Sequence, residues 1–330
     1  IFKFSYENII SLTFYYAWHV ITRKINHNYP DVRKNVLKSE SVTRAIEQVS
    51  CDQYRIKTLT KQQQQQVKNI CHQDVKNENE YQQFIRKNRH KAFELYEELS
   101  SCISSSLLRI AGWILYRLLS RMFNSVQFSK AQIEQIRHRQ KLFDNKNNNK
   151  QQQQKSDIPI IYLPLHRSYL DCILITFILS MNGLNPPLIA INDHCCLPFF
   201  DNLIRGLGAF FIRKKCIKNN NNNVKADHGN NNNNDNNNNN DDDDNENDPI
   251  HKAILRSYII ENLRQGNSME FFLEDSRTST GKVLMPNLHL LSIVLDALAE
   301  GRFGFFLLVI LFCFPHRHMM INVFSFLHFS

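Results

Sequence analysis

The sequence predicts an α/β fold, in which a partly parallel sheet is flanked by helices and preceded by a helical N-terminal region. Short apolar runs of strand length alternate with segments of helical periodicity between residues 158 and 300. Polar and basic residues follow several of these runs directly. Such alternation is typical of a layered α/β domain, whose sites form where the strands end.

Each element is expected from its own local signal. Strand-like apolar runs stand at 158–165, 187–191, 209–213 and 269–273. Helical periodicity is found at 106–123, 170–181, 197–207, 249–265 and 286–300. Asp248 and Pro249 predict a helix start, with Asp as N-cap and Pro at the first position. Gly266 and Gly301 are expected to end the last two helices, because glycine readily adopts the left-handed conformation found there.

Low-complexity tracts divide the chain. Residues 1–144 are expected to form the helical N-terminal region, and 145–155 an Asn/Gln linker. Residues 156–302 are expected to form the α/β domain, which is interrupted by an Asn/Asp insertion at 219–248. That insertion is nearly all Asn and Asp, has almost no apolar side chains to bury, and is expected to be disordered. Residues 303–330 form an atypical apolar tail, and we suspect a truncated or misread C-terminus there.

The segment 106–123 combines an Arg stripe with a wide apolar surface. Its arginines are Arg109, Arg117 and Arg121. This profile predicts either a basic amphipathic helix on anionic lipid or a helix packed on the domain with solvated arginines. The residues alone leave both interpretations open.

Composition narrows the classes of function. The net charge of +9 suits an anionic partner such as phospholipid, a phosphorylated substrate or nucleic acid, but no nucleic-acid-binding motif is present. The eight cysteines form no CxxC pair, so we expect reduced thiols. His194, Cys195 and Cys196 lack a second ligand pair, so no metal site is expected. No apolar run reaches the roughly 18 residues of a transmembrane helix.

Three polar motifs could carry chemistry. His166 and Asp171 follow the first apolar run. They can meet if the histidine lies in the turn and the aspartate on the first helical turn, where the carboxylate would orient the imidazole as a general base. The alternative is a helix capping box starting at Ser168. The other two motifs contain cations suited to phosphate: Arg213, Lys214 and Lys215 after one run, and Arg277 and Lys282 after another.

Taken together, the motifs supply one base, one orienting acid and several phosphate-binding cations. There is no nucleophilic serine elbow, and Ser276 occupies the position where a P-loop requires its first glycine. This set of residues favours direct transfer of an acyl group to a hydroxyl of a phosphorylated acceptor.

The three motifs, in this order, resemble the first three sequence blocks of the glycerol-3-phosphate acyltransferase family. The matching residues are His166-x4-Asp171, Gly208-x-Phe-Phe-Ile-Arg213 and Phe-Leu-Glu274-x-x-Arg277-x-x-x-Gly281-Lys282. The segments LPLHRSYLDCILITFIL, LGAFFIRKK and LLSIVLDAL are most similar to mitochondrial-type members, and dihydroxyacetone-phosphate acyltransferase is the near neighbour. The similarity covers about residues 110–302 without the Asn tracts.

The resemblance implies a function and roles. His166 would deprotonate the sn-1 hydroxyl of glycerol 3-phosphate, Asp171 would orient it, and acyl-CoA would donate the acyl group without a cofactor or metal. The phosphate would contact Arg213, Lys214, Arg277 and Lys282, with Glu274 and Gly281 ordering the third block. The resemblance also implies a phospholipid surface, most simply the mitochondrial outer membrane, with endoplasmic reticulum or peroxisome as alternatives.

This sequence departs from the family in the third block and after residue 302. The family usually has Glu-Gly-Thr-Arg-Ser-Arg, whereas Asp275 replaces the glycine and Ser279 the second arginine. An expected fourth block with Val-Pro-Ile is absent. These departures leave open an inactive lipid- or acyl-CoA-binding pseudoenzyme.

Overall fold

The structure is a computed structural model. The described residues are 2–3, 29–64, 74–122, 125–128, 133–134, 136–138, 159–164, 170–192, 198–212, 248–272, 274, 285–301, 306–314 and 318–329.

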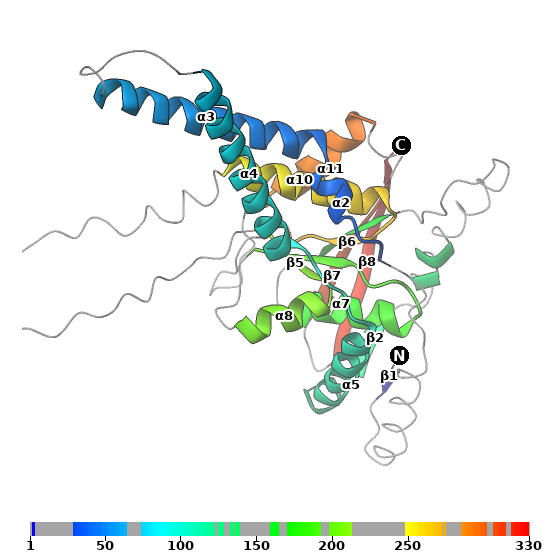
Figure 1. Ribbon diagram of the computed structural model, residues 1–330. Coiled ribbons are helices and arrows are strands. Elements are labelled where there is room, and N and C mark those ends of the chain that lie inside the picture. Colours follow the sequence, from blue (N-terminus) through cyan, green and yellow to red (C-terminus); the bar gives the residue numbers. More distant parts are fainter. Residues whose placement is uncertain are drawn as a thin grey trace, which may run out of the picture.

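A sheet of eight strands forms the centre of the molecule, in the order β1-β2-β8-β7-β3-β6-β4-β5 (Figure 1). The strands are β1 (Phe2–Lys3), β2 (Ser125–Phe128), β3 (Ile160–Pro164), β4 (Leu188–Ile191), β5 (Ala209–Phe211), β6 (Met269–Glu270), β7 (Phe306–Phe314) and β8 (His318–Phe329). The run β7-β3-β6-β4-β5 is parallel throughout. The predicted α/β class with a partly parallel sheet is therefore confirmed.

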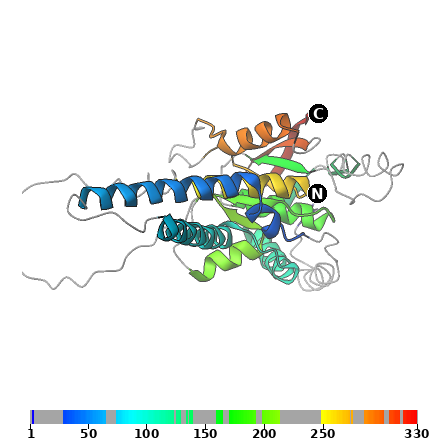
Figure 2. The ribbon, with the colours of Figure 1, turned by 45° about the horizontal axis from the view of Figure 1, so that its top comes forward.

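Helices cover both faces of the sheet (Figures 1 and 2). They are α2 (Arg33–Leu37), α3 (Glu40–Gln64), α4 (Asp74–Leu99), α5 (Ser105–Met122), α7 (Leu170–Met181), α8 (Pro198–Gly206), α10 (Pro249–Arg264) and α11 (His289–Ala299). Helices α10 and α11 lie above the sheet in Figure 1, and α5, α7 and α8 lie below it. Among the described residues, no helix has the length and apolarity that a membrane span requires.

Strand β3 contributes side chains to two hydrophobic cores, one on each face of the sheet. Its side chains alternate between faces because successive residues of a strand point in opposite directions. Ile161 and Leu163 join a core with α2, α3, α4, α10 and α11. Ile160 and Tyr162 join a second core with α5, α7, Ile133 and Ile136. Every residue of β3 is buried, which explains its continuous apolar sequence.

Helix α10 begins and ends where its local sequence predicts. The side chain of Asp248 accepts a hydrogen bond from the Ile250 N–H at 3.1 Å, and Pro249 occupies the first turn. Gly266, with φ of 83°, follows the last turn. Both predictions are confirmed, and the cap is strengthened by an ion pair of Asp248 with Lys91 at 2.7 Å.

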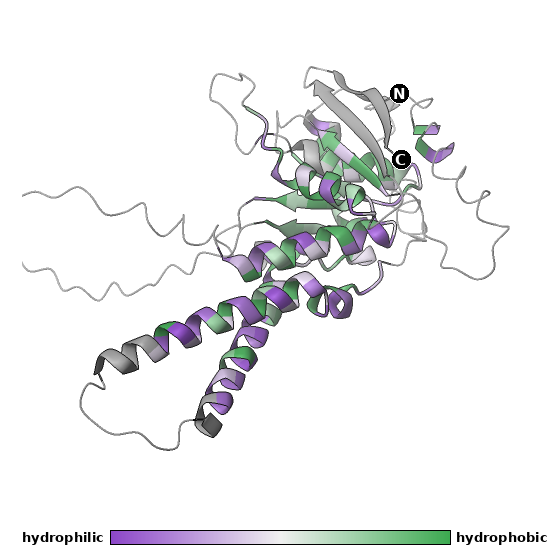
Figure 3. Ribbon diagram, turned by 90° about the horizontal axis from the view of Figure 1, so that it is seen from above, coloured by the Kyte–Doolittle hydropathy of each residue, from purple (hydrophilic) through white to green (hydrophobic). Residues whose placement is uncertain are grey.

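The helical region before the sheet does not form a separate core. Helices α3 and α4 pack together near the sheet, diverge as they project from it, and have a largely hydrophilic surface (Figure 3). Asn88 ties the pair together by donating to Ser50 Oγ and Gln53 Oε1. At their inner ends, Val42 and Leu95 enter the core that also contains β3 and β6.

Four strands lie where the sequence did not lead us to expect them. Within residues 1–144, expected to be helical, β1 and β2 pair with each other. In the apolar tail, β7 pairs in parallel with β3, and β8 returns antiparallel to β7. The tail is rich in Phe, Ile, Leu and Val, residues that favour strands. Its strand β7 therefore extends the parallel sheet directly beside β3.

Candidate active site

Strands β3 and β6 end side by side at one edge of the sheet. Tyr162 of β3 lies opposite Glu270 of β6, and Ile189 of β4 lies opposite the same glutamate. Because all these strands are parallel, the segments that leave their carboxyl ends start from one edge. The first and third sequence motifs follow β3 and β6. The chain therefore enters both motifs from neighbouring strands.

The first motif is split between the β3–α7 connection and the first turn of α7. His166 lies outside the described residues. Asp171 is the second residue of α7, as expected from its spacing, although its side chain is not described. Leu174 and Ile178 of the same helix pack with Tyr162 in one core. The first turn of α7 is thereby held against β3, and a carboxylate there is favoured by the helix dipole.

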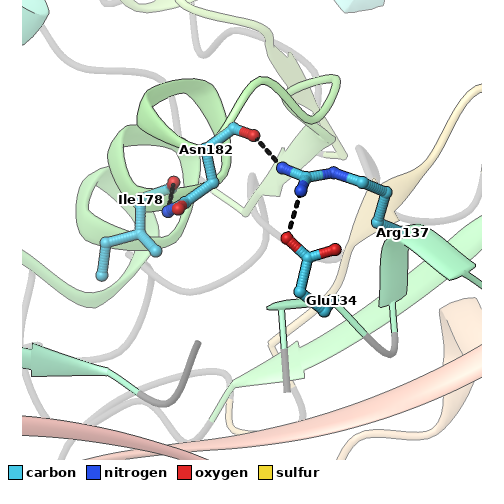
Figure 4. Close-up of polar contacts among 4 residues, drawn as sticks. All are labelled: Glu134, Arg137, Ile178 and Asn182. Carbon is cyan, nitrogen blue, oxygen red and sulfur yellow. Dashed lines mark hydrogen bonds and ion pairs between the residues drawn. The ribbon is translucent and has the colours of Figure 1, made fainter. Parts of the chain in front are cut away.

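The other end of α7 is held by an arginine that the sequence analysis missed. Arg137 donates a hydrogen bond to the Asn182 carbonyl and forms an ion pair with Glu134 (Figure 4). The Asn182 side chain donates to the Ile178 carbonyl at 2.7 Å (Figure 4). These contacts satisfy carbonyls that the helix end leaves open. With both ends anchored, the helix that carries Asp171 has a defined direction relative to β3.

The second motif contains strand β5 and the glycine that precedes it. Gly208 has φ of 109°, and a Cβ there would lie 3.2 Å from the Pro187 carbonyl oxygen. Phe210 and Phe211 are buried, and the Ile212 N–H donates to the Ile191 carbonyl at 2.9 Å. Strand pairing thus continues up to the residue before Arg213. Arg213 and Lys214 lie outside the described residues.

Arg205, which the sequence analysis did not single out, joins this strand to the helical pair. Its guanidinium donates to the carbonyls of Glu97 and Glu98 at the end of α4. The same group lies 5.7 Å from the ring centroid of Phe211. A cation suits the carbonyl end of a helix and an aromatic face. Arg205 therefore fixes β5 against α4. An isolated Arg near a helix end gives no sequence signal for such distant partners.

The third motif leaves β6 as buried chain. The Phe271 N–H donates to the Tyr162 carbonyl at 3.0 Å, so contact with β3 continues past the last residue of β6. Glu274 is buried, with 8% of its surface exposed. A buried carboxylate is costly unless it is paired or hydrogen-bonded. Residues 275–284, which include Arg277, Gly281 and Lys282, lie outside the described residues.

A second buried carboxylate, Glu270, was not among the predicted site residues. It is fully buried beside Tyr162. Its strand neighbour Met269 faces the α10 side, so alternation directs Glu270 to the α7 side. Burial, and then the charge of Glu270, raise the pKa of the Tyr162 hydroxyl. The sequence signal that could have identified Glu270 is its position as a single acidic residue in an otherwise apolar, strand-like run.

The structure therefore describes the framework of the predicted site and one of its side chains. Three strand ends, the first turn of α7 and the buried Glu274 belong to the described residues. Within that same part of the chain, no cluster of three or more His, Cys, Asp or Glu side chains could hold a metal ion.

Comparison with known proteins agrees with this framework. A family model described as Acyltransferase matches residues 143–309, a range that begins before the Asn/Gln tract and ends inside β7. The chain is 29% identical to glycerol-3-phosphate acyltransferase 1, mitochondrial, of Bos taurus over 217 residues. The matched residues make up 66% of this chain. It is 28% identical over 288 residues, or 87% of this chain, to a probable mitochondrial glycerol-3-phosphate acyltransferase of Caenorhabditis elegans.

The chain is also similar to a bacterial protein named for the same activity. The glycerol-3-phosphate acyltransferase of Shewanella frigidimarina is 24% identical over 268 residues, or 81% of this chain. The matched regions cover 22%, 30% and 24% of the lengths of the cattle, nematode and bacterial proteins. This chain thus spans less than a third of each relative that it matches here.

Proposed function

Because this chain belongs to the acyltransferase family, we propose that it transfers a fatty acyl group from acyl-CoA to the sn-1 hydroxyl of glycerol 3-phosphate, forming lysophosphatidic acid. One observation carries the proposal: the proposed site residues follow the carboxyl ends of β3, β5 and β6, which belong to one parallel block. The relatives named glycerol-3-phosphate acyltransferase support the acceptor.

In the proposed mechanism, His166 accepts the proton of the acceptor hydroxyl while Asp171 holds the imidazole in the required tautomer. The acceptor oxygen attacks the thioester carbonyl, the C–S bond breaks, and the proton passes from the imidazolium to the departing CoA sulfur. No covalent enzyme intermediate, cofactor or metal takes part. General base catalysis contributes about 10²–10⁴-fold, and the positioning of two bound reactants contributes further.

The acceptor phosphate would be held by Arg213, Lys214, Arg277 and Lys282. Glu274 is buried where the third motif begins, which suits its proposed role in ordering the loop with Arg277 and Gly281. Asp275 and Ser279 add one anion and remove one cation relative to the family pattern. Each close charge pair changes binding by about 1–4 kcal/mol at intermediate dielectric. We therefore expect weaker phosphate binding than the family pattern would give.

The proposed donor and product are both amphiphiles, so we propose that the reaction takes place at a phospholipid surface. The word mitochondrial in the names of two relatives supports the mitochondrial outer membrane, with endoplasmic reticulum and peroxisome as alternatives.

The proposal is tested by measuring CoA release by the purified chain with glycerol 3-phosphate and with dihydroxyacetone phosphate as acceptors. His166→Ala should lower turnover by about 10²–10⁴-fold and leave acyl-CoA binding intact. The matched control is His289→Ala, because His289 is an exposed histidine on α11. Full turnover by His166→Ala would contradict the proposed base.

The acceptor comparison separates the alternatives. Faster transfer to dihydroxyacetone phosphate would assign the chain to the neighbouring activity. A parent chain that binds acyl-CoA but releases no CoA with either acceptor would be the pseudoenzyme that Asp275 and Ser279 leave open. In an active chain, Arg277→Ala should chiefly raise the KM for the acceptor.

A further inference from the structure

Helix α5 presents a row of large apolar side chains to solvent. Ile110, Trp113, Ile114 and Leu118 are 56%, 41%, 53% and 46% exposed. Their spacing of three or four residues places them on one side of the helix, defined here as the outer face of α5. Single exposed apolar residues are common on proteins, but a continuous row of four marks an interaction surface.

The opposite side of α5 is fully engaged, which fixes the direction of the outer face. Leu115, Tyr116 and Leu119 are buried in the core that contains β3 and α7. The helix cannot rotate to bury its outer face without exposing these side chains. Complete exposure of one such side chain costs about 1.5–3 kcal/mol, so the outer face stays turned away from the sheet.

The charged side chains on the outer face favour an anionic occupant, because helical spacing places Arg117 and Arg121 among its apolar residues. Arg117 and Arg121 are exposed, and the sequence of α5 contains no Asp or Glu. The Arg117 guanidinium lies 5.8 Å from the ring centroid of Trp113. Arginine, tryptophan and aliphatic residues on one helix surface are the combination that binds the boundary between lipid headgroups and acyl chains.

We propose that the outer face of α5 docks on a bilayer that contains anionic phospholipid. Ile110, Ile114 and Leu118 enter the acyl boundary, Trp113 lies at the headgroup level, and Arg117 and Arg121 pair with lipid phosphates. Docking at this face serves the proposed acyl transfer, and its biological purpose rests on that proposed function. Since α5 shares a core with α7, docking also brings the helix that carries Asp171 close to the bilayer.

The test measures binding of the whole chain to phosphatidylcholine vesicles with and without phosphatidylserine. The protein has two tryptophans, so Trp18→Phe leaves Trp113 as the only intrinsic tryptophan probe. Its emission should shift to the blue on binding to vesicles with phosphatidylserine, and the binding should weaken as salt rises. Ile114→Asp should weaken vesicle binding by about tenfold or more, because an apolar contact is replaced by a charge repelled by the lipid.

Matched variants separate this face from the rest of the surface. Leu288→Asp makes a similar change at a residue that is 52% exposed just before α11, and it should leave vesicle binding unchanged. Arg121→Gln should reduce binding only to vesicles with phosphatidylserine. Equal binding by Ile114→Asp and the parent chain would overturn the proposal.

Evidence for either of two other occupants of the outer face would also overturn the proposal. If Ile114→Asp lowers the melting temperature without lipid, another part of the chain covers the outer face. If it converts a dimer to a monomer, the occupant is a second copy. CoA release from a short-chain, water-soluble acyl-CoA is measured separately, so a chain without acyl transfer can still pass or fail the vesicle test.

Discussion

Helices α10 and α5 lie on opposite faces of the sheet and use their apolar residues differently. The buried residues of α10 include Ile254, Tyr258 and Leu263, and none of the large apolar side chains of this helix is exposed. Helix α5 buries Leu115 and Leu119 on one side, while Ile114 and Leu118 face solvent on the other. The difference teaches that an apolar residue at helical spacing need not contribute to the folded core. Helix α10 belongs to the core, whereas the outer face of α5 is available to a partner.

The sharpest test of this comparison is one substitution made in both helices. Ile254→Ala should lower the free energy of unfolding by about 2–5 kcal/mol, because Ile254 is fully buried and its truncation leaves a cavity. Ile114→Ala should change it by less than about 0.5 kcal/mol, because the side chain is 53% exposed. Chemical denaturation measures both values. Similar losses for the two variants would refute the distinction between the helices.

Periodicity predicted the elements but not their partners. The apolar pattern of 106–123 is compatible with a covered or an uncovered outer face, because it records only which residues share a side of the helix. The exposures of Ile114 and Leu118 distinguish the two cases. In contrast, the start of α10 was predictable, because the Asp248 cap depends on neighbours in the chain.

The same limit applies to the candidate site. The motifs could be placed after strands from the sequence, since each apolar run ends in polar residues. The position of β6 between β3 and β4 depends on pairing between distant segments, and so does the parallel pairing of β7 with β3. The contacts of Arg137 with Asn182 and of Arg205 with α4 are likewise non-local and leave no mark in a short window.

A second prediction concerns the polar group that α10 places in its core. The Tyr258 hydroxyl accepts a hydrogen bond from the Ser101 N–H at 3.2 Å, and its oxygen lies 3.0 Å from Ser101 Oγ. Tyr258→Phe removes the acceptor and should lower the free energy of unfolding by about 1–3 kcal/mol. Measurement near neutral pH isolates this loss. No change would mean that the hydroxyl contributes nothing to the attachment of α10.

The same variant has a pH signature. Burial raises the pKa of Tyr258. Above pH of about 10, tyrosine in the unfolded chain loses its proton while Tyr258 in the folded chain keeps it. The unfolded state then binds fewer protons, so stability falls as pH rises through this range. Denaturation above pH of about 10 should show a smaller alkaline loss for Tyr258→Phe than for the parent chain.

The smallest expected difference concerns how the two helices begin. Asp248 caps α10 at 3.1 Å and pairs with Lys91, whereas Ser104 Oγ accepts from the Leu107 N–H of α5 at 3.4 Å in an exposed position. Asp248→Ala should cost about 0.5–2 kcal/mol, and Ser104→Ala should lie at or below the lower end of that range. Denaturation of both variants measures the difference. If Ser104→Ala cost more, the start of α5 would be held at least as firmly as that of α10. The contrast between the two helices would then be confined to the outer face of α5.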